Sequence, residues 1–573
     1  MHQGLNRLWP VLVLAVFGIP LFIGLGATDV GNDEAIYSYA VDSILETGKW
    51  LAPQSSPDDD ITFVEKPHLK FWIVAAPIRF GLLPHNEFGF RFWDALFGAL
   101  TFLYVFLIGR RLAGAICGLF AVILLFAQTP LLFDHGLRSN NMEAALVLAY
   151  CGGAYHFLRW GAGGSHRWRH IAAVAGWFFL GFMTKFVAVV FLPVFLGASA
   201  LLLPQSRRQL AQDWWRWVLA GLAVVALALP WFLYQSAVLG DWFWYVMFGE
   251  HVYNRFTKFI DPEHVQPWHF YFSEAYIQLR RTGSVIWVVL GIVTLLVHTI
   301  RRRTPEGVVV LLWLSIPVAL MSLGSSKLYH YFYPYLPPLA IGAGAAVSWM
   351  LSAAERRFVA PAWMKRPLSG PLRAAAWTVA ALALTLALAT AILGTVRIEA
   401  GSLFFRNSSL LRPVSIGLLA IVAAGGLQIG GALAVVLLIP LIVPTPFPSV
   451  GSNLRRLTVT DRPLSALAEC IRRVDPGGGA YAPVTEPAFR HPYFYYMRGD
   501  GWRERVDAER LRSALRVDGR ERPVLIQPSD YAEFLDNTGP LPDAPSRVQQ
   551  PTVLVLLPGR FKSCASVTAS DVR

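Results

Sequence analysis

Residues 112–133 read LAGAICGLFAVILLFAQTPLLF, an apolar run that follows Arg110 and Arg111 and precedes the polar stretch DHGLRSNN at 134–141. The hydrocarbon core of a bilayer needs about 20 consecutive apolar residues in a helix that crosses it. This run is therefore long enough to cross a membrane once, with arginines at one end and polar side chains at the other.

The composition of the whole chain agrees with this interpretation. Of its 573 residues, 55% are hydrophobic and 15% are charged, whereas soluble proteins have about 45–50% apolar and ~25% charged residues. This excludes an ordinary soluble enzyme. Further apolar runs lie at 9–27, 90–109, 141–158, 170–183, 186–203, 215–237, 284–300, 307–323, 331–352, 373–394, 413–426 and 428–446. The sequence predicts an α-helical, polytopic membrane protein with about thirteen transmembrane helices.

The formal net charge of +13 would suggest a nucleic-acid partner in a soluble protein. Here the basic residues cluster after even-numbered runs, at Arg110-Arg111, at Arg159, Arg167 and Arg169, at Arg207-Arg208, at Arg301-Arg302-Arg303, and at Arg356, Arg357, Lys365 and Arg366. Because cytoplasmic loops carry the Lys and Arg excess of membrane proteins, the clusters predict that the N-terminus lies inside. Residues 28–89, 238–283 and everything after 447 then lie outside, and we expect no nucleic-acid partner.

One apolar segment, 69–83, is short and carries Arg79. Counting it as a membrane span would invert the side predicted for every later basic cluster. We therefore expect an amphipathic helix that lies in the outer membrane interface, with a second such helix at 33–47.

The composition changes after residue 447. Residues 450–573 contain many arginines, a turn at Pro476-Gly477-Gly478-Gly479, and β-like runs at 524–526 and 552–557. This pattern predicts a small extracytoplasmic α/β domain over 447–573, after a transmembrane catalytic domain over 1–446. Cys470 and Cys564 would lie in an oxidising compartment, where either a disulfide or two buried thiols is possible.

The polar residues that could carry chemistry gather on the predicted outer face. Asp33 and Glu34 follow the first span, where a carboxylate can act as a general base, although a solvated helix cap is the simpler interpretation. Lys66 suits a phosphate at headgroup depth, and a lysine that reaches from an interfacial helix to water is the alternative. Three other clusters lie at 134–141, 241–274 and 325–331.

Carboxylates and cations at headgroup depth fit the transfer of a group from a lipid phosphate. The cations would stabilise the phosphate as it leaves, and the acid would deprotonate the acceptor. The sequence contains no Walker loop, GxGxxG or DxD-type nucleotide motif. A transporter or flippase is an alternative, but it would place charges near the bilayer midplane, and the spans here are nearly free of charge. A non-catalytic subunit of cell-envelope polysaccharide assembly is a further alternative.

At these clusters the sequence resembles bacterial polyprenyl-phosphate-dependent glycosyltransferases of the GT-C type, in particular the lipid A aminoarabinose transferases of glycosyltransferase family 83 and their protein-mannosyltransferase-like relatives. The matching stretches, spread over roughly the first 340 residues, are Asp33-Glu34, Gly48-Lys49-Trp50, Glu65-Lys66-Pro67, Thr184-Lys185, Glu250-His251 through Phe256, Gln266-Pro267-Trp268 through Tyr271, and Ser326-Lys327-Leu328 through Pro334.

The resemblance implies an inverting transfer of a sugar from undecaprenyl phosphate to a hydroxyl or phosphate group. The acceptor would be an outer-leaflet glycolipid, lipopolysaccharide, polysaccharide or protein at the bacterial inner membrane, and the active site would face the periplasm. By position, Asp33, next to Glu34, is the candidate base. Candidates for holding the lipid phosphate and the donor are Lys66, Arg138, Arg255, Lys327 and Tyr331. Relatives can hold a divalent metal at the positions of Glu65 and His251, and no other cofactor is expected.

The sequence also departs from this family. Ile36 and Phe63 stand where the aminoarabinose enzymes have Arg and Tyr, and Asn141, with Glu143 two residues later, stands where a second acid is expected. We therefore expect the contacts to sugar and phosphate to differ from those of the aminoarabinose enzymes, and the sequence does not name the sugar.

Overall fold

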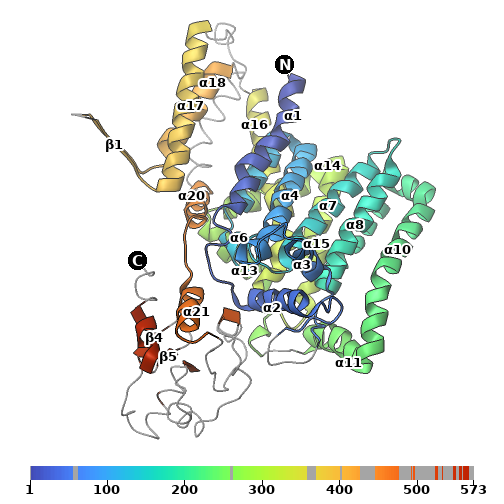
Figure 1. Ribbon diagram of the computed structural model, residues 1–573. Helices are drawn as coiled ribbons and strands as arrows, with labels where there is room; N and C mark the ends of the chain where they lie inside the picture. The colour runs from blue at the N-terminus through green and yellow to red at the C-terminus, as the bar shows by residue number, and fades with distance from the viewer. Residues whose placement is uncertain are drawn as a thin grey trace.

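The computed structural model describes residues 2–55, 62–258, 262–357, 370–400, 403–425 and 446–476, and short pieces at 492, 495–496, 523–526, 532, 546–549, 554–557 and 559–566. These residues are mainly helical, and the long helices pack side by side in a bundle (Figure 1). The predicted fold class of a helical membrane protein with a small C-terminal sheet is confirmed.

The first element is α1 (His2–Val13), which continues as a π-helix and a 3-10 helix to Phe22. It then forms α2 (Asn32–Thr47) and α3 (Leu69–Arg79), where the sequence predicted two interfacial helices. Since a helix rises about 1.5 Å per residue, the 11 residues of α3 are too few to cross a bilayer.

The bundle is built from helices that coincide with the remaining predicted spans. They are α4 (Glu87–Ala113), α5 (Ala115–Phe126), α6 (Thr129–Phe133), α7 (Glu143–Gly161), α8 (Arg167–Lys185), η3 (Phe186–Val189), α9 (Phe191–Leu202), α10 (Pro204–Leu239), α14 (Val285–Arg302), α15 (Pro305–Leu323), α16 (Leu336–Arg357), α17 (Gly370–Leu393) and α18 (Leu411–Gly425). In the described part of the chain, 7 helices are long and apolar enough to cross a membrane. The predicted total of about thirteen spans stays a prediction, and the span predicted at 428–446 lies outside the described residues.

Glycines let α5 pack closely between α4 and α16. A Cβ added at Gly118 of α5 would lie 2.4 Å from the carbonyl oxygen of Phe106 in α4. A Cβ added at Gly344 of α16 would lie 2.2 Å from the carbonyl oxygen of Cys117. Because side chains at these positions would force the helices apart, the glycines set the spacing at the centre of the bundle.

The outer-loop segments gather at one end of this bundle. α2, α3 and α11 (Asp241–Trp244) lie at the end away from the N-terminus (Figure 1). The predicted outer loop 238–283 is partly helical and continues through η4 (Tyr245–Asn254), α12 (Arg255–Thr257), η5 (Pro262–His264) and α13 (Phe270–Arg281). Another irregular helix, η6 (Tyr329–Tyr335), precedes α16.

The C-terminal part contains α20 (Phe447–Arg456), α21 (Pro463–Val474), a three-stranded antiparallel sheet and η8 (Gly559–Ser566). The strands are β3 (Val524–Ile526), β4 (Ser546–Gln549) and β5 (Leu554–Leu557), in the order β3-β5-β4. β3 and the described part of the run at 552–557 are strands, as predicted. Cys470 and Cys564 form a disulfide, which joins α21 to η8. The domain boundary at 446/447 stays a prediction, and most of the predicted glycine turn lies outside the described residues.

A second, unforeseen pair of strands, β1 (Val396–Ala400) and β2 (Leu403–Asn407), forms an antiparallel hairpin between α17 and α18.

The C-terminal part packs on the first outer loop. The carboxylate of Asp29 accepts a hydrogen bond from the backbone N–H of Leu464 at 2.6 Å, and so caps the start of α21. Glu87 at the start of α4 accepts hydrogen bonds from Arg462 and Tyr496, each at 2.9 Å. These contacts hold the segment before α2 and the start of α4 against the C-terminal part.

Candidate active site

The two adjacent acids at the start of α2 have different environments. Glu34 is buried, and its two oxygens accept hydrogen bonds from Arg91 at 2.6 and 2.9 Å. Its carboxylate also accepts from the backbone N–H groups of Gly31 and Asn140. Burial alone would raise the pKa of Glu34, but the charge and hydrogen bonds of Arg91 and these backbone donors bring it below the ordinary value. Glu34 is thus held ionised as a structural partner of Arg91.

Asp33 is the accessible acid. Its side chain is 45% exposed, and its Oδ2 lies 3.8 Å from Nδ1 of His135. His135 is one of the few non-glycine residues with a positive φ, 51°, a backbone conformation that costs free energy and is found often at functional sites. The geometry leaves Asp33 able to accept a proton from a group in solvent or at the membrane surface.

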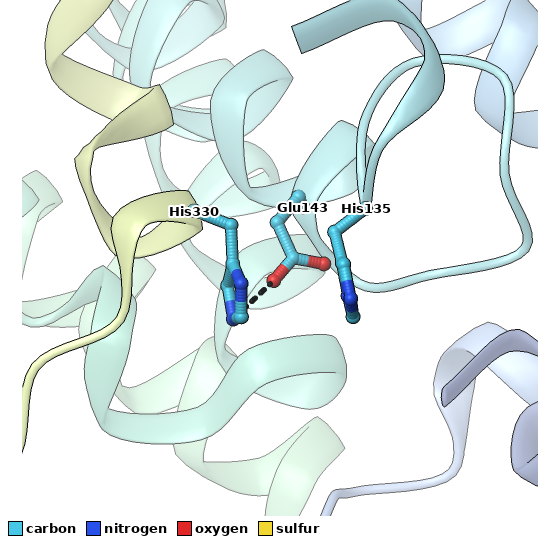
Figure 2. Close-up of side chains that lie close together, drawn as sticks. All are labelled: His135, Glu143 and His330. Atoms are coloured by element: carbon cyan, nitrogen blue, oxygen red, sulfur yellow. Dashed lines mark ion pairs between the residues drawn. The ribbon is translucent and has the colours of Figure 1, made fainter. Parts of the chain in front are cut away.

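His135 belongs to a compact cluster with Glu143 and His330, shown in Figure 2. The two imidazole rings stack with centroids 4.6 Å apart and an interplanar angle of 13°. Nε2 of His330 lies 3.4 Å from Oε1 of Glu143, and the same oxygen accepts a hydrogen bond from Lys185 at the end of α8. The cluster thus connects Asp33 to Lys185 through His135, Glu143 and His330, which come from three separate segments.

Lys185 opens onto a cavity of about 440 Å³ between α8, the 245–256 segment and η6. Three cations line the cavity, Lys66, Lys185 and Arg255, whereas Glu65 is the carboxylate that lines it. Arg255 donates a hydrogen bond to the hydroxyl of Tyr331, and the ammonium of Lys185 lies 5.2 Å from the centroid of the Tyr331 ring. The remaining walls are mostly apolar, so the cavity suits an anionic head on an apolar chain.

The pKa of Lys66 reflects both its burial and the charges around it. Burial lowers the pKa of its ammonium to about 8; the carboxylate of Glu65 opposes the shift, and the charges of Arg255 and Lys185 add to it. Nζ of Lys66 lies 3.9 Å from Oε2 of Glu65, which is itself 53% exposed. An anion in the cavity would relieve the repulsion among the three cations.

Two other predicted phosphate ligands are used elsewhere. Lys327 is buried and donates hydrogen bonds to the carbonyl oxygens of Gln266, at 2.8 Å, and Gly324. Arg138 donates to the carbonyl oxygens of Leu21 and Ile23 at 3.0 and 2.5 Å. Neither side chain lines the cavity. Of the predicted phosphate ligands, the structure brings together Lys66, Arg255 and Tyr331.

The predicted metal pair does not form a complete ligand set. Nε2 of His251 lies 3.8 Å from Oε2 of Glu65. Burial and the charges of Lys66 and Arg255 lower the pKa of His251 to about 2, so its ring is neutral. Zinc sites in proteins use three or four ligands, and no third His, Cys, Asp or Glu of the described residues completes a set with these two.

Among the residues described, the three side chains close enough to hold an ion together are His135, Glu143 and His330, whose ligand atoms lie within 4.8 Å of one another. The ammonium of Lys185 already contacts the carboxylate of Glu143 and would repel a divalent ion there. The residues present therefore do not fit a metal ion at either place.

The sequence pattern placed His135, Glu143, Lys185 and His330 in polar clusters or motifs but did not assign them a role. The one feature of the sequence that could have indicated a role is Lys185 itself. It is a cation at the predicted outer end of an apolar helix whose second half is otherwise free of charge. Its connection to Glu143 is made by packing between α7 and α8 and is not readable from spacing.

The chain is similar to known membrane glycosyltransferases. Residues 65–234 match the family model described as dolichyl-phosphate-mannose-protein mannosyltransferase. A relative from Pseudomonas fluorescens Pf-5, named undecaprenyl phosphate-alpha-4-amino-4-deoxy-L-arabinose arabinosyl transferase 2, is 29% identical over 61% of this chain and 58% of its own length. A Pseudomonas aeruginosa relative, with the same name but no number, is 28% identical over 59% of each chain. The alignments thus span about three fifths of these relatives.

Solved structures show the same fold over nearly the whole chain. The crystal structure of ArnT from Cupriavidus metallidurans bound to undecaprenyl phosphate aligns with a TM-score of 0.61 and 18% identity, covering 97% of this chain and 99% of ArnT. The apo state of the same protein aligns with a TM-score of 0.62. The chain is therefore a multi-pass membrane protein with the GT-C fold, similar in sequence to the undecaprenyl phosphate-aminoarabinose arabinosyl transferases.

Proposed function

We propose that the protein is an inverting membrane glycosyltransferase that moves a sugar from a polyprenyl phosphate, such as undecaprenyl phosphate, to an outer-leaflet acceptor. The observation that supports this most directly is the cavity lined by Lys66, Lys185 and Arg255, in which three cations surround a largely apolar space. A lipid phosphate supplies both the anion and the apolar chain that such a cavity requires.

In this proposal, the cations hold the donor phosphate and stabilise the charge that develops on it as the bond from phosphate oxygen to the sugar C1 breaks. The acceptor oxygen attacks C1 from the opposite face, which inverts its configuration. Asp33 removes the proton of the acceptor group as the new bond forms. Glu34 is left out of the chemistry because Arg91 holds both of its oxygens.

Asp33 and the cations of the cavity affect each other electrostatically, which supports their use in one reaction. The charge of Asp33 is close enough to raise the pKa of Lys66 against the larger effect of burial. The His135, His330 and Glu143 cluster also fills the space between Asp33 and Lys185. Asp33, the proposed base, therefore lies next to the cluster that contacts Lys185, one of the proposed phosphate ligands.

For the acceptor we propose a glycolipid of the lipid A type, with polysaccharide and protein as the alternatives to be tested. The names of the similar arabinosyl transferases include undecaprenyl phosphate, which supports the proposed donor. We also propose that the protein lies in the bacterial inner membrane, with the cavity and residues 447–573 on the periplasmic side. The Cys470–Cys564 disulfide supports this side, because disulfides persist in oxidising compartments.

The test has two parts. Lipid and protein fractions of cells with and without the gene are compared by mass spectrometry, and a sugar-modified glycolipid should be present only when the gene is present. The purified protein is then incubated with undecaprenyl phosphate-aminoarabinose and lipid A as trial substrates, and release of undecaprenyl phosphate is measured.

Lys66→Ala should abolish this release, whereas Lys49→Ala, at an exposed position of the same outer loop, should leave it unchanged. Unaltered glycans in all fractions of cells lacking the gene would refute the proposed function.

A further inference from the structure

A second cavity lies at the other end of α8. This helix has 19 residues, which correspond to ~28 Å at a rise of about 1.5 Å per residue and match a hydrocarbon core of ~30 Å. Its last residue, Lys185, lines the cavity at the candidate active site, and its first residue, Arg167, lines the second cavity. The two cavities therefore belong to opposite faces of the membrane.

This second cavity is polar and has a volume of about 640 Å³. It lies between the loop that joins α7 to α8 and the start of α10. Helices α8 and α10 lie near each other in Figure 1. Its walls include Arg167, Arg208, Gln205, Gln212 and the backbone of Gly163 and Gly164. Both glycines have a positive φ, 82° and 113°, so the loop turns sharply here and leaves room beside the helix ends.

Arg167 is held in place at the wall of this cavity. Its Nη1 lies 3.1 Å from Oδ2 of Asp213 and donates a hydrogen bond to Oε1 of Gln212 at 3.2 Å. Asp213 is buried, and its carboxylate also accepts hydrogen bonds from Trp160 at 3.1 Å and Arg216 at 2.7 Å. An arginine fixed before binding loses little conformational entropy when an anion arrives.

Arg208 supplies positive charge that the described residues do not neutralise. Its side chain is exposed, and within the described ranges no hydrogen bond or ion pair reaches it. The loop and helix ends around the cavity, 159–169 and 204–216, contain six arginines and one acidic residue. Since Asp213 already pairs with two of the arginines, the cavity carries an excess of positive charge.

Exposed tryptophans place the cavity at the depth of lipid headgroups. Trp168 and Trp214, on the two helices that border the cavity, are 56% and 60% exposed. Tryptophan is enriched where a membrane protein meets the interface between lipid and water. Basic pockets between transmembrane helices at this depth bind anionic lipid headgroups.

We propose that this cavity binds the phosphate of an anionic phospholipid in the leaflet opposite the candidate active site, between Arg167 and Arg208. The amides of Gln205 and Gln212 are positioned to hydrogen-bond the polar remainder of the headgroup. The proposal does not depend on the enzymatic function, because it involves neither Asp33 nor the cations of the other cavity.

The test is native mass spectrometry of the purified full-length protein in detergent, titrated with phosphatidylglycerol or with phosphatidylcholine. Phosphatidylglycerol should bind saturably and about tenfold more tightly than phosphatidylcholine, because its headgroup has a net negative charge, whereas the choline cation balances the phosphate charge of phosphatidylcholine. Arg208→Gln should weaken phosphatidylglycerol binding about tenfold through the loss of one charged hydrogen-bond donor. The matched control is Arg302→Gln, which removes one exposed arginine in the last turn of α14, outside the cavity.

Arg302→Gln should change the affinity by no more than about twofold. Equal weakening by the two variants would overturn the proposal, since it would mean that general surface charge attracts the lipid. Equal affinity for the two lipids would overturn it too. Inorganic phosphate and glycerol 3-phosphate are added as competitors, and binding of either as tight as that of phosphatidylglycerol would show a site for soluble anions instead of a lipid site.

Discussion

Asp33 and Glu34 are neighbours in the sequence, yet only one of them is available for chemistry. Consecutive residues of a helix point about 100° apart, so the first turn of α2 directs Glu34 into the bundle toward Arg91 and leaves Asp33 near His135. The sequence could place an acidic pair at the membrane surface. It could not tell the two acids apart, because the difference depends on Arg91, which lies 57 residues away from Glu34.

Replacing Asp33 by Asn tests its role as the base. The variant should lose sugar transfer by about 10²–10⁴-fold, the usual contribution of a general base, while undecaprenyl phosphate binding and thermal stability stay unchanged. Turnover is followed as release of undecaprenyl phosphate. Glu46→Gln, which removes a carboxylate at the far end of α2, is the control and should transfer normally. Near-normal turnover of Asp33→Asn would remove Asp33 from the mechanism.

Lys185 is the cation whose role only the folded structure suggests. Lys185→Gln should weaken undecaprenyl phosphate binding about tenfold, since a hydrogen bond to a charged group contributes about 1.5–3 kcal/mol. Lys327→Ala should instead lower the melting temperature and leave the affinity nearly unchanged, because Lys327 donates to two backbone carbonyls. Binding is measured by native mass spectrometry with undecaprenyl phosphate. The reverse pattern would show that Lys327, and not Lys185, holds the phosphate.

At the scale of the elements, the packing of α2 against α4 depends on the buried ion pair between Glu34 and Arg91. Arg91 of α4 donates hydrogen bonds to Glu34 and to the backbone carbonyl oxygens of Leu25, Thr28 and Asp29. Arg91→Met should destabilise the protein by about 3–5 kcal/mol, because it leaves the charge of Glu34 buried without a partner. Thermal unfolding in detergent measures the effect.

The control for Arg91 is Arg111→Met. Arg111 pairs with Glu306, and the two side chains are 26% and 14% exposed, so its loss should cost less than the loss of Arg91, whose ion pair is 4% exposed on each side. If both variants melted at the same temperature, the buried pair would not be what fixes α2 on α4.

The helices and the strands differ in how well the sequence foretold them. The predicted spans within the described residues coincide with helices because long apolar runs have few other ways to satisfy their backbone in a membrane. The hairpin of β1 and β2 was missed because each strand has only five residues, which leaves little periodicity to detect. The pairing of Cys470 with Cys564, 94 residues apart, likewise depends on how α21 and η8 pack.

For the whole molecule, the distribution of arginines predicts which end of the bundle faces the cytoplasm. A cysteine introduced at Glu46, at the end of α2, should react with a membrane-impermeant thiol reagent in cells whose outer membrane alone is permeabilised. A cysteine at Arg302 should react only after the inner membrane is opened. Cys117 and Cys151 are buried and Cys470 is paired with Cys564, so background labelling should be low. Labelling of the Arg302 position from outside would invert the topology.

The composition of the whole chain was enough to predict a membrane protein, and the order of its motifs indicated the fold family. The site was only partly predictable. Lys66, Arg255 and Tyr331 were expected together and line one cavity, whereas Lys327 and Arg138 belong to loops that fold back on backbone carbonyls. The sequence does not distinguish a charged side chain that binds a ligand from one that hydrogen-bonds the backbone of a loop, because the difference lies in the groups that surround each side chain.

The proposed mechanism requires that the cavity lined by Lys66, Lys185 and Arg255 hold the phosphate of a polyprenyl donor. A structure of the protein with undecaprenyl phosphate, determined by cryo-electron microscopy in a lipid nanodisc, tests it directly. We expect phosphate density within hydrogen-bond distance of Lys66, Lys185 and Arg255, with the polyprenyl chain leaving along the apolar wall of the cavity. Phosphate density at another place on the protein, with this cavity empty, would show that the cavity is not the donor site.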